Sequence, residues 1–288
     1  MLVWLSIVVV MPANAQKLPN KQEVSIWLPS NIQIDGKATE WDNQYQAYNK
    51  NTETFYSIAN DDDNLYLILH ATKSRIIEKI IEGGISFTIY IPGTKDENKH
   101  VTVLFPLLSM NKSRSVLIEA GKTLSEDMNS PLLNYQQPDL AEKRAHSISM
   151  ANTDLINSLK EIKVDGISSI IDTVAGVTPK TKYYGDFPLH MHIFKIIAIN
   201  NEDGIKAMTQ FDSEGALTYE MILPIKYLES AKKGTQKFKY NITINSRGED
   251  SRFGDVIRRG PPPNHDQLDL DLETATDFSG EYTLAKKP

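Results

Sequence analysis

The sequence predicts a mainly β protein, an antiparallel β-sandwich of the immunoglobulin or jelly-roll kind with a short helix and a partly helical insertion. Several short segments alternate apolar and polar residues, and residues 85–91 (ISFTIYI) and 217–223 (LTYEMIL) do so without a slip. Such alternation is typical of strands with one buried face. Turn-forming clusters separate these segments, for example residues 201–204 (NEDG) and 212–215 (DSEG). Short strands divided by such turns favour a sandwich.

A hairpin is expected over residues 54–70. Tyr56 and Ile58 share one face of its first strand, and three alternate leucines share one face of its second strand. Between the strands, residues 61–64 (DDDN) have side chains that hydrogen-bond the local backbone and tolerate turn conformations. Strand, polar turn and strand in this order indicate a hairpin.

The remaining elements are predicted from apolar residues at strand spacing (every second residue) or at helical spacing (every third or fourth residue). Residues 24–29 are expected to form a first strand that holds Trp27, and residues 74–83 a short helix in which Ser74 caps the start and Gly83 ends it. Further strands are expected at residues 100–105, 116–120, 161–167, 169–174, 192–199, 205–211, 237–245 and 278–285.

Residues 121–160 break the strand pattern and are interpreted as an insertion. Helical spacing places Leu155, Ile156 and Leu159 on one face of a helix. A helical segment of this size has too little apolar surface to fold alone. We therefore expect a single domain over residues 16–288, with the insertion packed on its surface.

The N-terminus resembles a secretory signal peptide. An apolar run at residues 2–11 precedes Ala13-Asn14-Ala15, which predicts cleavage between Ala15 and Gln16. The run is shorter than the roughly 20 residues of a membrane span. We therefore expect residues 1–15 to be removed, no transmembrane segment in the mature chain, and a periplasmic or extracellular location. No Lys or Arg precedes the run, and a buried N-terminal strand is the alternative.

Composition narrows the possible partners. The net charge of -6 argues against nucleic acid, which requires a basic surface. The chain has no cysteine, so it forms no disulfide. Export without disulfides is more typical of a bacterial periplasm or exterior than of a eukaryotic secretory pathway.

Two motifs carry a family resemblance. Residues 34–41 (IDGKATEW) with the hairpin after them, and residues 215–228 (GALTYEMILPIKYL), resemble carbohydrate-binding module family 9-like domains. These are β-sandwiches close in fold to the DOMON group of sugar- and haem-binding domains. The resemblance covers about residues 25–115 and 161–284. It implies glycan binding and a structural, buried role for Trp41. In family 9 modules proper a tryptophan pair sandwiches the sugar, and no such pair is assigned in this sequence.

No catalytic motif is found, and we expect no enzyme. A Gly-x-Ser-x-Gly elbow is absent. Paired carboxylates for glycoside cleavage are recognised by spacing in three dimensions, and Glu220 is the one candidate of that kind. The alternative is that Glu220 pairs with a neighbouring strand or caps a backbone group.

No metal or cofactor is predicted, although three groups of residues have suitable ligand types. His190 and His192 near Asp186 have ligand types that suit zinc or copper, and Met191 with His192 offers the axial pair of a DOMON-like haem. Residues 61–64 offer oxygens to calcium but lack the EF-hand pattern. A structural loop and a hairpin turn explain these residues as well.

The expected function is that of an exported, non-catalytic binding module for a glycan or similar polar ligand. Tyr183, Tyr184 and Arg247 are the candidate ligand-binding residues, because rings stack on sugar C–H groups and a guanidinium binds hydroxyls; ordinary surface residues are the alternative. The alternative function is a structural or protein-interaction module of the bacterial cell envelope, with residues 121–160 facing an envelope protein.

Overall fold

The structure is a computed structural model of the 288-residue chain. It describes residues 17–28, 32–41, 44–91, 99–121, 138–167, 183–184, 187–188, 194–228, 237–247 and 271–288, with the backbone alone at 138–140, 183–184 and 187–188. The expected signal peptide (residues 1–15) and the strand expected at residues 169–174 lie outside the described residues.

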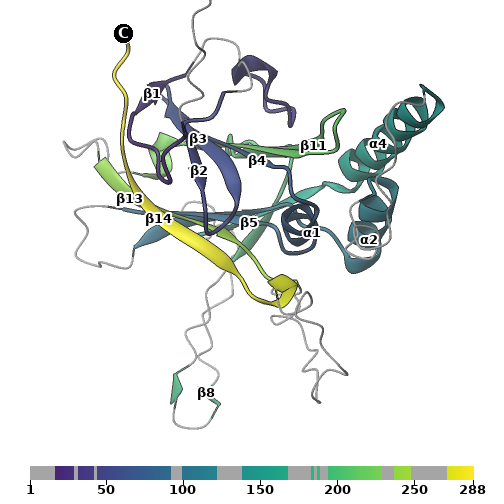
Figure 1. Ribbon diagram of the computed structural model, residues 1–288. Coiled ribbons are helices and arrows are strands. Elements are labelled where there is room, and N and C mark those ends of the chain that lie inside the picture. The colour runs from purple at the N-terminus through teal and green to yellow at the C-terminus, as the bar shows by residue number, and fades with distance from the viewer. Residues whose placement is uncertain are drawn as a thin grey trace, which may run out of the picture.

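Two sheets of six strands form a mainly antiparallel β-sandwich in this part of the chain, which confirms the predicted fold class (Figure 1). The first sheet has the order β1-β3-β4-β12-β11, with β2 also paired to β3, and consists of β1 (Ile26–Trp27), β2 (Ala47–Asn49), β3 (Thr54–Asn60), β4 (Asn64–Ala71), β11 (Lys206–Phe211) and β12 (Leu217–Pro224). The second has the order β10-β7-β6-β5-β13-β14 and consists of β5 (Ile85–Tyr90), β6 (His100–Phe105), β7 (Glu161–Asp165), β10 (Lys195–Ala198), β13 (Lys237–Ile244) and β14 (Thr276–Thr283). Two short strands, β8 (Tyr183–Tyr184) and β9 (Phe187–Pro188), pair with each other, and two 3₁₀ turns are η1 (Thr39–Trp41) and η2 (Ile225–Tyr227).

The predicted hairpin is β3 and β4. In its turn, the Asp61 carboxylate accepts the backbone N–H groups of Asp63 (2.8 Å) and Asn64 (2.6 Å). Tyr56 and Ile58 lie in the core between the sheets together with the three alternate leucines of β4. The other face of the hairpin points away from that core, because side chains alternate along a strand.

Helix α1 (Ser74–Gly83) lies between the two layers at one side of the sandwich (Figure 1). Its isoleucines are buried in the core, as predicted. The expected cap is wrong: Lys73 precedes the first turn and makes no side-chain cap bond. Gly84, in the left-handed region at φ +74°, follows the helix and donates its N–H to the carbonyl of Ile80 (2.8 Å).

The strand expected at residues 116–120 is wrong, because this segment belongs to helix α2 (Met110–Glu119). Ser113, Val116 and Leu117 are buried with the i, i+3, i+4 spacing of one helix face. The Ser113 hydroxyl donates to the Ile81 carbonyl of α1 (3.2 Å), so α2 packs on α1. A short apolar run does not distinguish a strand from a buried helix.

The insertion contains helix α4 (Pro138–Ser158), which packs beside α2 and against β11 (Figure 1). Leu155 and Leu159 are buried, as expected. Ile156 is 39% exposed, so its place on the buried face is wrong. The buried residues of α4 belong to the same core as the sheets, and for that reason the helix extends the domain.

Side-chain amides pair with backbone groups of the first sheet at two places. At β3, the Gln22 amide accepts the N–H of Ile58 (2.6 Å) and donates to the Ile58 carbonyl (2.8 Å). At β11, Asn152 of α4 does the same to Phe211, accepting its N–H and donating to its carbonyl (both 2.8 Å). Gln22 fills the gap between the residues of β3 that pair with β1 and those that pair with β2. Asn152 occupies the place of a further strand at Phe211, and this part of the β11 edge is thereby protected.

Two core tyrosines differ in how their hydroxyl groups are satisfied. The Tyr56 hydroxyl lies 3.0 Å from that of Tyr240 and accepts the backbone N–H of Gln22 (2.9 Å). The hydroxyl of Tyr219, fully buried on β12, has no hydrogen-bond partner among the described residues. An unpaired buried hydroxyl is destabilising.

Replacing these tyrosines with phenylalanine should have opposite effects on the free energy of unfolding. Tyr219→Phe should leave it unchanged or raise it by up to about 1 kcal/mol, because no bond is lost. Tyr56→Phe should lower it by about 1–3 kcal/mol, because the N–H of Gln22 is left buried and unpaired. Urea unfolding of both variants measures the difference, and equal losses would contradict the assignment of bonds.

Candidate functional site

Four partly exposed aromatic rings cluster on the outer face of the first sheet. The rings of Tyr45 and His70 are stacked, with centroids 5.3 Å apart and an interplanar angle of 16°. Phe55 lies 5.8 Å from Tyr45 and 4.8 Å from Tyr48. We refer to Tyr45, Tyr48, Phe55 and His70 as the aromatic cluster.

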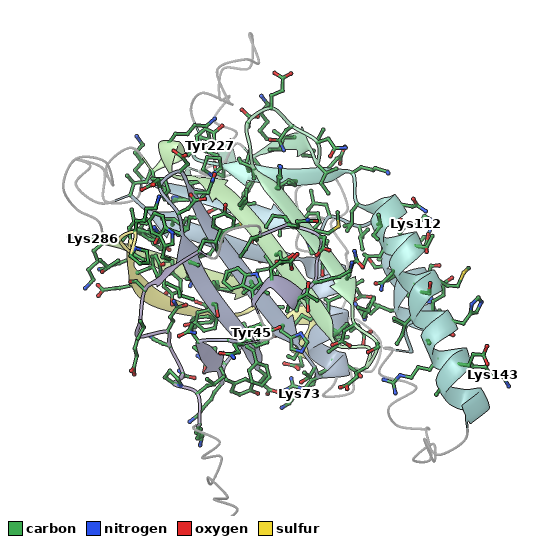
Figure 2. All side chains as sticks on the ribbon, turned by 90° about the horizontal axis from the view of Figure 1, so that it is seen from above. Tyr45, Lys73, Lys112, Lys143, Tyr227 and Lys286 are labelled. Carbon is green, nitrogen blue, oxygen red and sulfur yellow. The ribbon has the colours of Figure 1, made fainter. Side chains whose placement is uncertain are left out.

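The strand register brings these rings together. Phe55 of β3 is directly opposite His70 of β4 and opposite Tyr48 of β2. Side chains directly opposite each other in antiparallel strands lie on the same face, close enough to touch. Tyr45 comes from the loop before β2. Figure 2 shows Tyr45 over the sheet, at the end near Lys73.

Thr218 of β12 lies beside two of the rings. Its hydroxyl lies 3.1 Å from Nδ1 of His70, and its side chain acts to lower the pKa of Tyr45. Burial raises the pKa of Tyr45 to about 12. Burial also lowers the pKa of His70, against the opposing effect of Asp212 and Glu214 in the turn between β11 and β12. Both shifts favour the uncharged form of the ring side chains.

Beside the cluster, the buried carboxylate of Glu220 holds the loop that precedes Tyr45. One oxygen accepts the N–H groups of Asp35 (3.1 Å) and Gly36 (2.9 Å), and the other accepts the indole N–H of Trp41 (3.1 Å). Glu220 is only 1% exposed. The expectation that it caps backbone groups is confirmed, as is the buried, structural position of Trp41, which packs in a second apolar cluster on this face with Leu28.

Burial raises the pKa of Glu220 to about 7. The bonds from Gly36 and Trp41 act in the opposite direction, and the nearby Asp35 carboxylate adds to the rise. Removal from water disfavours the charged form, and this effect outweighs the three donors.

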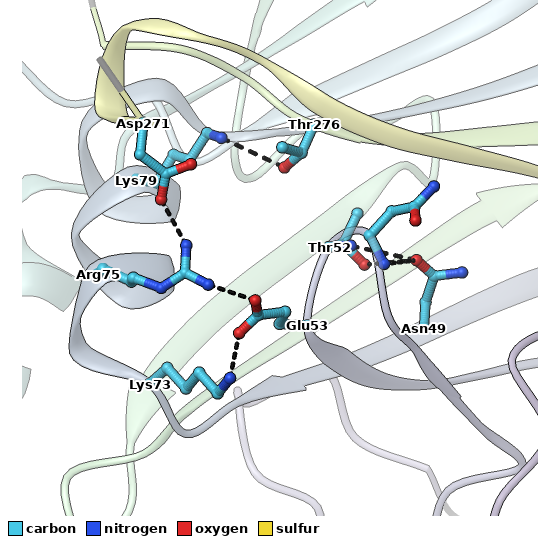
Figure 3. Close-up of polar contacts among 9 residues, drawn as sticks. Asn49, Thr52, Glu53, Lys73, Arg75, Lys79, Asp271 and Thr276 are labelled. Carbon is cyan, nitrogen blue, oxygen red and sulfur yellow. Dashed lines mark hydrogen bonds and ion pairs between the residues drawn. The ribbon is translucent and has the colours of Figure 1, made fainter. Parts of the chain in front are cut away.

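A polar network fixes the chain at the border of the cluster (Figure 3). Glu53, in the turn between β2 and β3, binds Lys73 and Arg75 of the α1 region, and Arg75 also binds Asp271. Glu53 has φ +53°, a left-handed conformation that is uncommon for a residue with a side chain. Burial acts to raise the pKa of Glu53, but the two cations outweigh it and lower the pKa.

The candidate ligand residues from the sequence are not part of this cluster in the described structure. Arg247 binds Glu82 and Glu78 of α1, and its backbone N–H donates to the carbonyl of Leu272 (2.7 Å). The guanidinium therefore ties the end of β13 to α1. Tyr183 and Tyr184 form β8, and their side chains lie outside the described residues. Their role in binding stays a prediction.

The described residues contain no group of three or more ligand-type side chains placed to hold a metal. The Asp61 carboxylate is used by its own turn and also accepts the Tyr66 hydroxyl (3.0 Å). The haem and metal candidates at residues 186–192 lie outside the described residues. A cavity of about 260 Å³ lies beside the same turn, at the end of the sheet where Figure 2 marks Tyr227. It is lined by four acidic residues, Asp62, Asp63, Glu202 and Asp203, together with Asn64, Gly204, Pro224, Ile225 and Lys226.

Sequence reasoning missed the aromatic cluster, although one signal for it was available. A turn at residues 61–64 implies that Phe55 pairs with His70. Both lie on the face of the hairpin opposite the leucines that the alternation assigns to the core, and alternation alone does not mark that face as a ligand site. Tyr45 carries no local signal, because its position depends on contacts with β12, far along the chain.

No family model, curated protein or solved structure matches the chain. No helix in the described part is long and apolar enough to cross a membrane.

Gly36 should be intolerant of a side chain. It has φ +83°, and a Cβ there would lie 2.9 Å from backbone atoms of both Thr209 and Gln210. Gly204 has a similar φ of +82°, but a Cβ there would meet only the Pro224 ring, at 3.1 Å. Gly204→Ala should lower the free energy of unfolding by about 1–2 kcal/mol, the left-handed penalty alone. Gly36→Ala should cost clearly more, and equal losses in thermal unfolding would contradict the close contact.

Glu220 should make stability fall as pH rises. Its pKa is raised from 4.5 in the unfolded chain to about 7 in the folded protein, so its contribution is fully present below pH 4.5 and is lost as pH rises through 7. The loss is at most about 3 kcal/mol. The free energy of unfolding of the wild type minus that of Glu220→Gln should fall by this amount between pH 4.5 and 7.5. Glu161→Gln, at an exposed position, is the control and should show no such trend.

Proposed function

We propose that the protein is a non-catalytic binding module that recognises a glycan or a similar polar ligand through the aromatic cluster. The observation that supports it is the group of four partly exposed rings on one sheet face. Aromatic rings with an exposed face are suited to the C–H groups of a sugar ring, and adjacent hydroxyls give orientation.

The composition of the site favours binding over chemistry. His70 is stacked on Tyr45 and shares its Nδ1 with the Thr218 hydroxyl. The carboxylate of Glu220 is used by three N–H donors and is buried. The polar atoms of these groups stabilise the structure of the site. The ring faces are therefore the groups that remain accessible to a ligand. The family resemblance of residues 34–41 and 215–228 points to the same class of ligand, and export of the mature chain is part of this proposal.

A second candidate function is a protein-interaction module of the cell envelope. Its support is that α2 and α4 expose Met110 (66%), Ile118 (52%), Met150 (49%) and Ile156 (39%). Figure 2 shows these helices at the side of the sheet, with Lys112 and Lys143 on them. Exposed apolar side chains that gather on one region are typical of interaction surfaces.

The proposal predicts glycan binding that depends on the rings. On a glycan array, Tyr45→Ala and Phe55→Ala should each weaken binding of a wild-type hit by about 10-fold or more, since stacking contacts are worth about 1–3 kcal/mol. Titration calorimetry with the same glycan gives the dissociation constants.

Tyr90→Ala is the matched control, because Tyr90 also stands next to a histidine, His100 (6.3 Å), but on the second sheet. It should bind as the wild type does. Binding that survives both cluster variants would contradict the site. Absence of any glycan hit, with an envelope protein captured through Met110 and Ile118, would favour the interaction module.

A further inference from the structure

A turn that carries two carboxylates lies at the border of the aromatic cluster. Residues 212–215 join β11 to β12, and Thr218 of β12 is directly opposite His70 in the neighbouring strand. The backbone N–H of Asp212 donates to the carbonyl of Ala216 (2.9 Å), so the strand pairing continues into the turn. The turn is therefore at the same end of the sheet as His70.

The side chain of Asp212 is on the face that holds the cluster. Phe211, the residue before it, lies in the core between the sheets, and side chains alternate along a strand. One carboxylate oxygen of Asp212 accepts the N–H groups of Glu214 and Ala216 (both 2.9 Å). The second oxygen has no hydrogen-bond partner in the described part of the chain, and the residue is exposed. This oxygen is therefore accessible to a ligand.

The charges that act on the two stacked rings come from carboxylates. Asp212 acts on both Tyr45 and His70, Glu220 also acts on Tyr45, and Glu214 also acts on His70. The face of an aromatic ring is itself negative and attracts cations. A positive group placed against these rings would therefore be attracted both by the rings and by the carboxylates.

The cations near the cluster are already engaged. Lys73 and Arg75, at its border, both bind the carboxylate of Glu53. Arg144 of α4 binds the backbone carbonyl of Glu214. Among the described residues, neither carboxylate of the turn forms an ion pair, so no salt bridge cancels their negative charge.

We propose that the ligand of the aromatic cluster is an amino sugar, whose protonated amine pairs with Asp212 while its ring packs on Tyr45. This proposal rests on the proposed function, because it names the class of glycan that the same site binds. Tyr45 and His70 are stacked with centroids 5.3 Å apart, so a cation cannot enter between them as it would in an aromatic cage. The cluster offers ring faces beside a carboxylate, which suits a sugar ring that carries its own amine.

The test compares three probes by titration calorimetry on the whole chain at about pH 6, where an amine is protonated and exposed carboxylates are ionised. The probes are a glucosamine oligomer, its N-acetylated form, and a glucose oligomer of the same length and linkage. The glucosamine oligomer should bind about 2–10-fold more tightly than either neutral probe. The difference should decrease in high salt, because salt screens exposed charges.

Two variants test the carboxylates of the turn. Asp212→Asn should weaken binding of the glucosamine oligomer by about 2–5-fold, and an asparagine still accepts the N–H groups of the turn. Glu214→Gln should weaken it by a smaller factor, and this side chain supports no described part of the fold. Glu202→Gln is the matched control, because it removes the same charge from an exposed turn residue at the other end of β11. It should bind all three probes as the wild type does.

The outcomes separate this proposal from the proposed function. A glucose oligomer that binds through Tyr45 as tightly as the glucosamine oligomer would leave the proposed function intact and overturn the amino sugar. So would a preference for glucosamine that is unchanged in both Asp212→Asn and Glu214→Gln, or a lysine oligomer that binds more tightly than the sugar. If none of the three sugar probes binds through Tyr45, both proposals are wrong.

Discussion

The outer face of the first sheet depends on one buried carboxylate. Glu220 satisfies two backbone N–H groups and the indole of Trp41, which come from a segment about 180 residues earlier in the chain. Burying a carboxylate is unfavourable unless donors surround it. Glu220 therefore selects one position of the loop, and the loop in turn covers the apolar residues Tyr66 and Ile68 of β4. This part of the sheet is therefore covered on both faces.

The covered part ends where the aromatic cluster begins. Beyond Trp41 no further layer in the described part of the chain covers Phe55 and His70, and their rings remain partly exposed. Polar interactions nevertheless fix the chain around these rings. They are the hydrogen bond of Thr218 with His70 and the ion pairs of Glu53 with Lys73 and Arg75. Rigid elements that present partly exposed rings lose little entropy when a ligand binds.

The local sequence pattern was sufficient to predict most strands and α1, because alternation and helical spacing indicate directly which side chains face the core. It failed at residues 116–120, where the i, i+3, i+4 spacing begins outside the short apolar run at Ser113. It also placed Ile156 on the wrong side of α4. The hydrogen bond between Glu220 and Gly36 could not be predicted from the local sequence pattern, because it joins two segments that are distant in the sequence. The hairpin register, by contrast, would have paired Phe55 with His70.

The amides of Gln22 and Asn152 have a consequence for self-association. A further chain that paired with β11 at Phe211 would have to displace Asn152 from bonds that already use the N–H and carbonyl of that residue. Gln22 does the same for Ile58 of β3, between the residues that pair with β1 and those that pair with β2. Both amides lie on segments outside the two sheets, the N-terminal leader and α4. A deletion that removed either segment would leave these backbone groups free to pair with another chain.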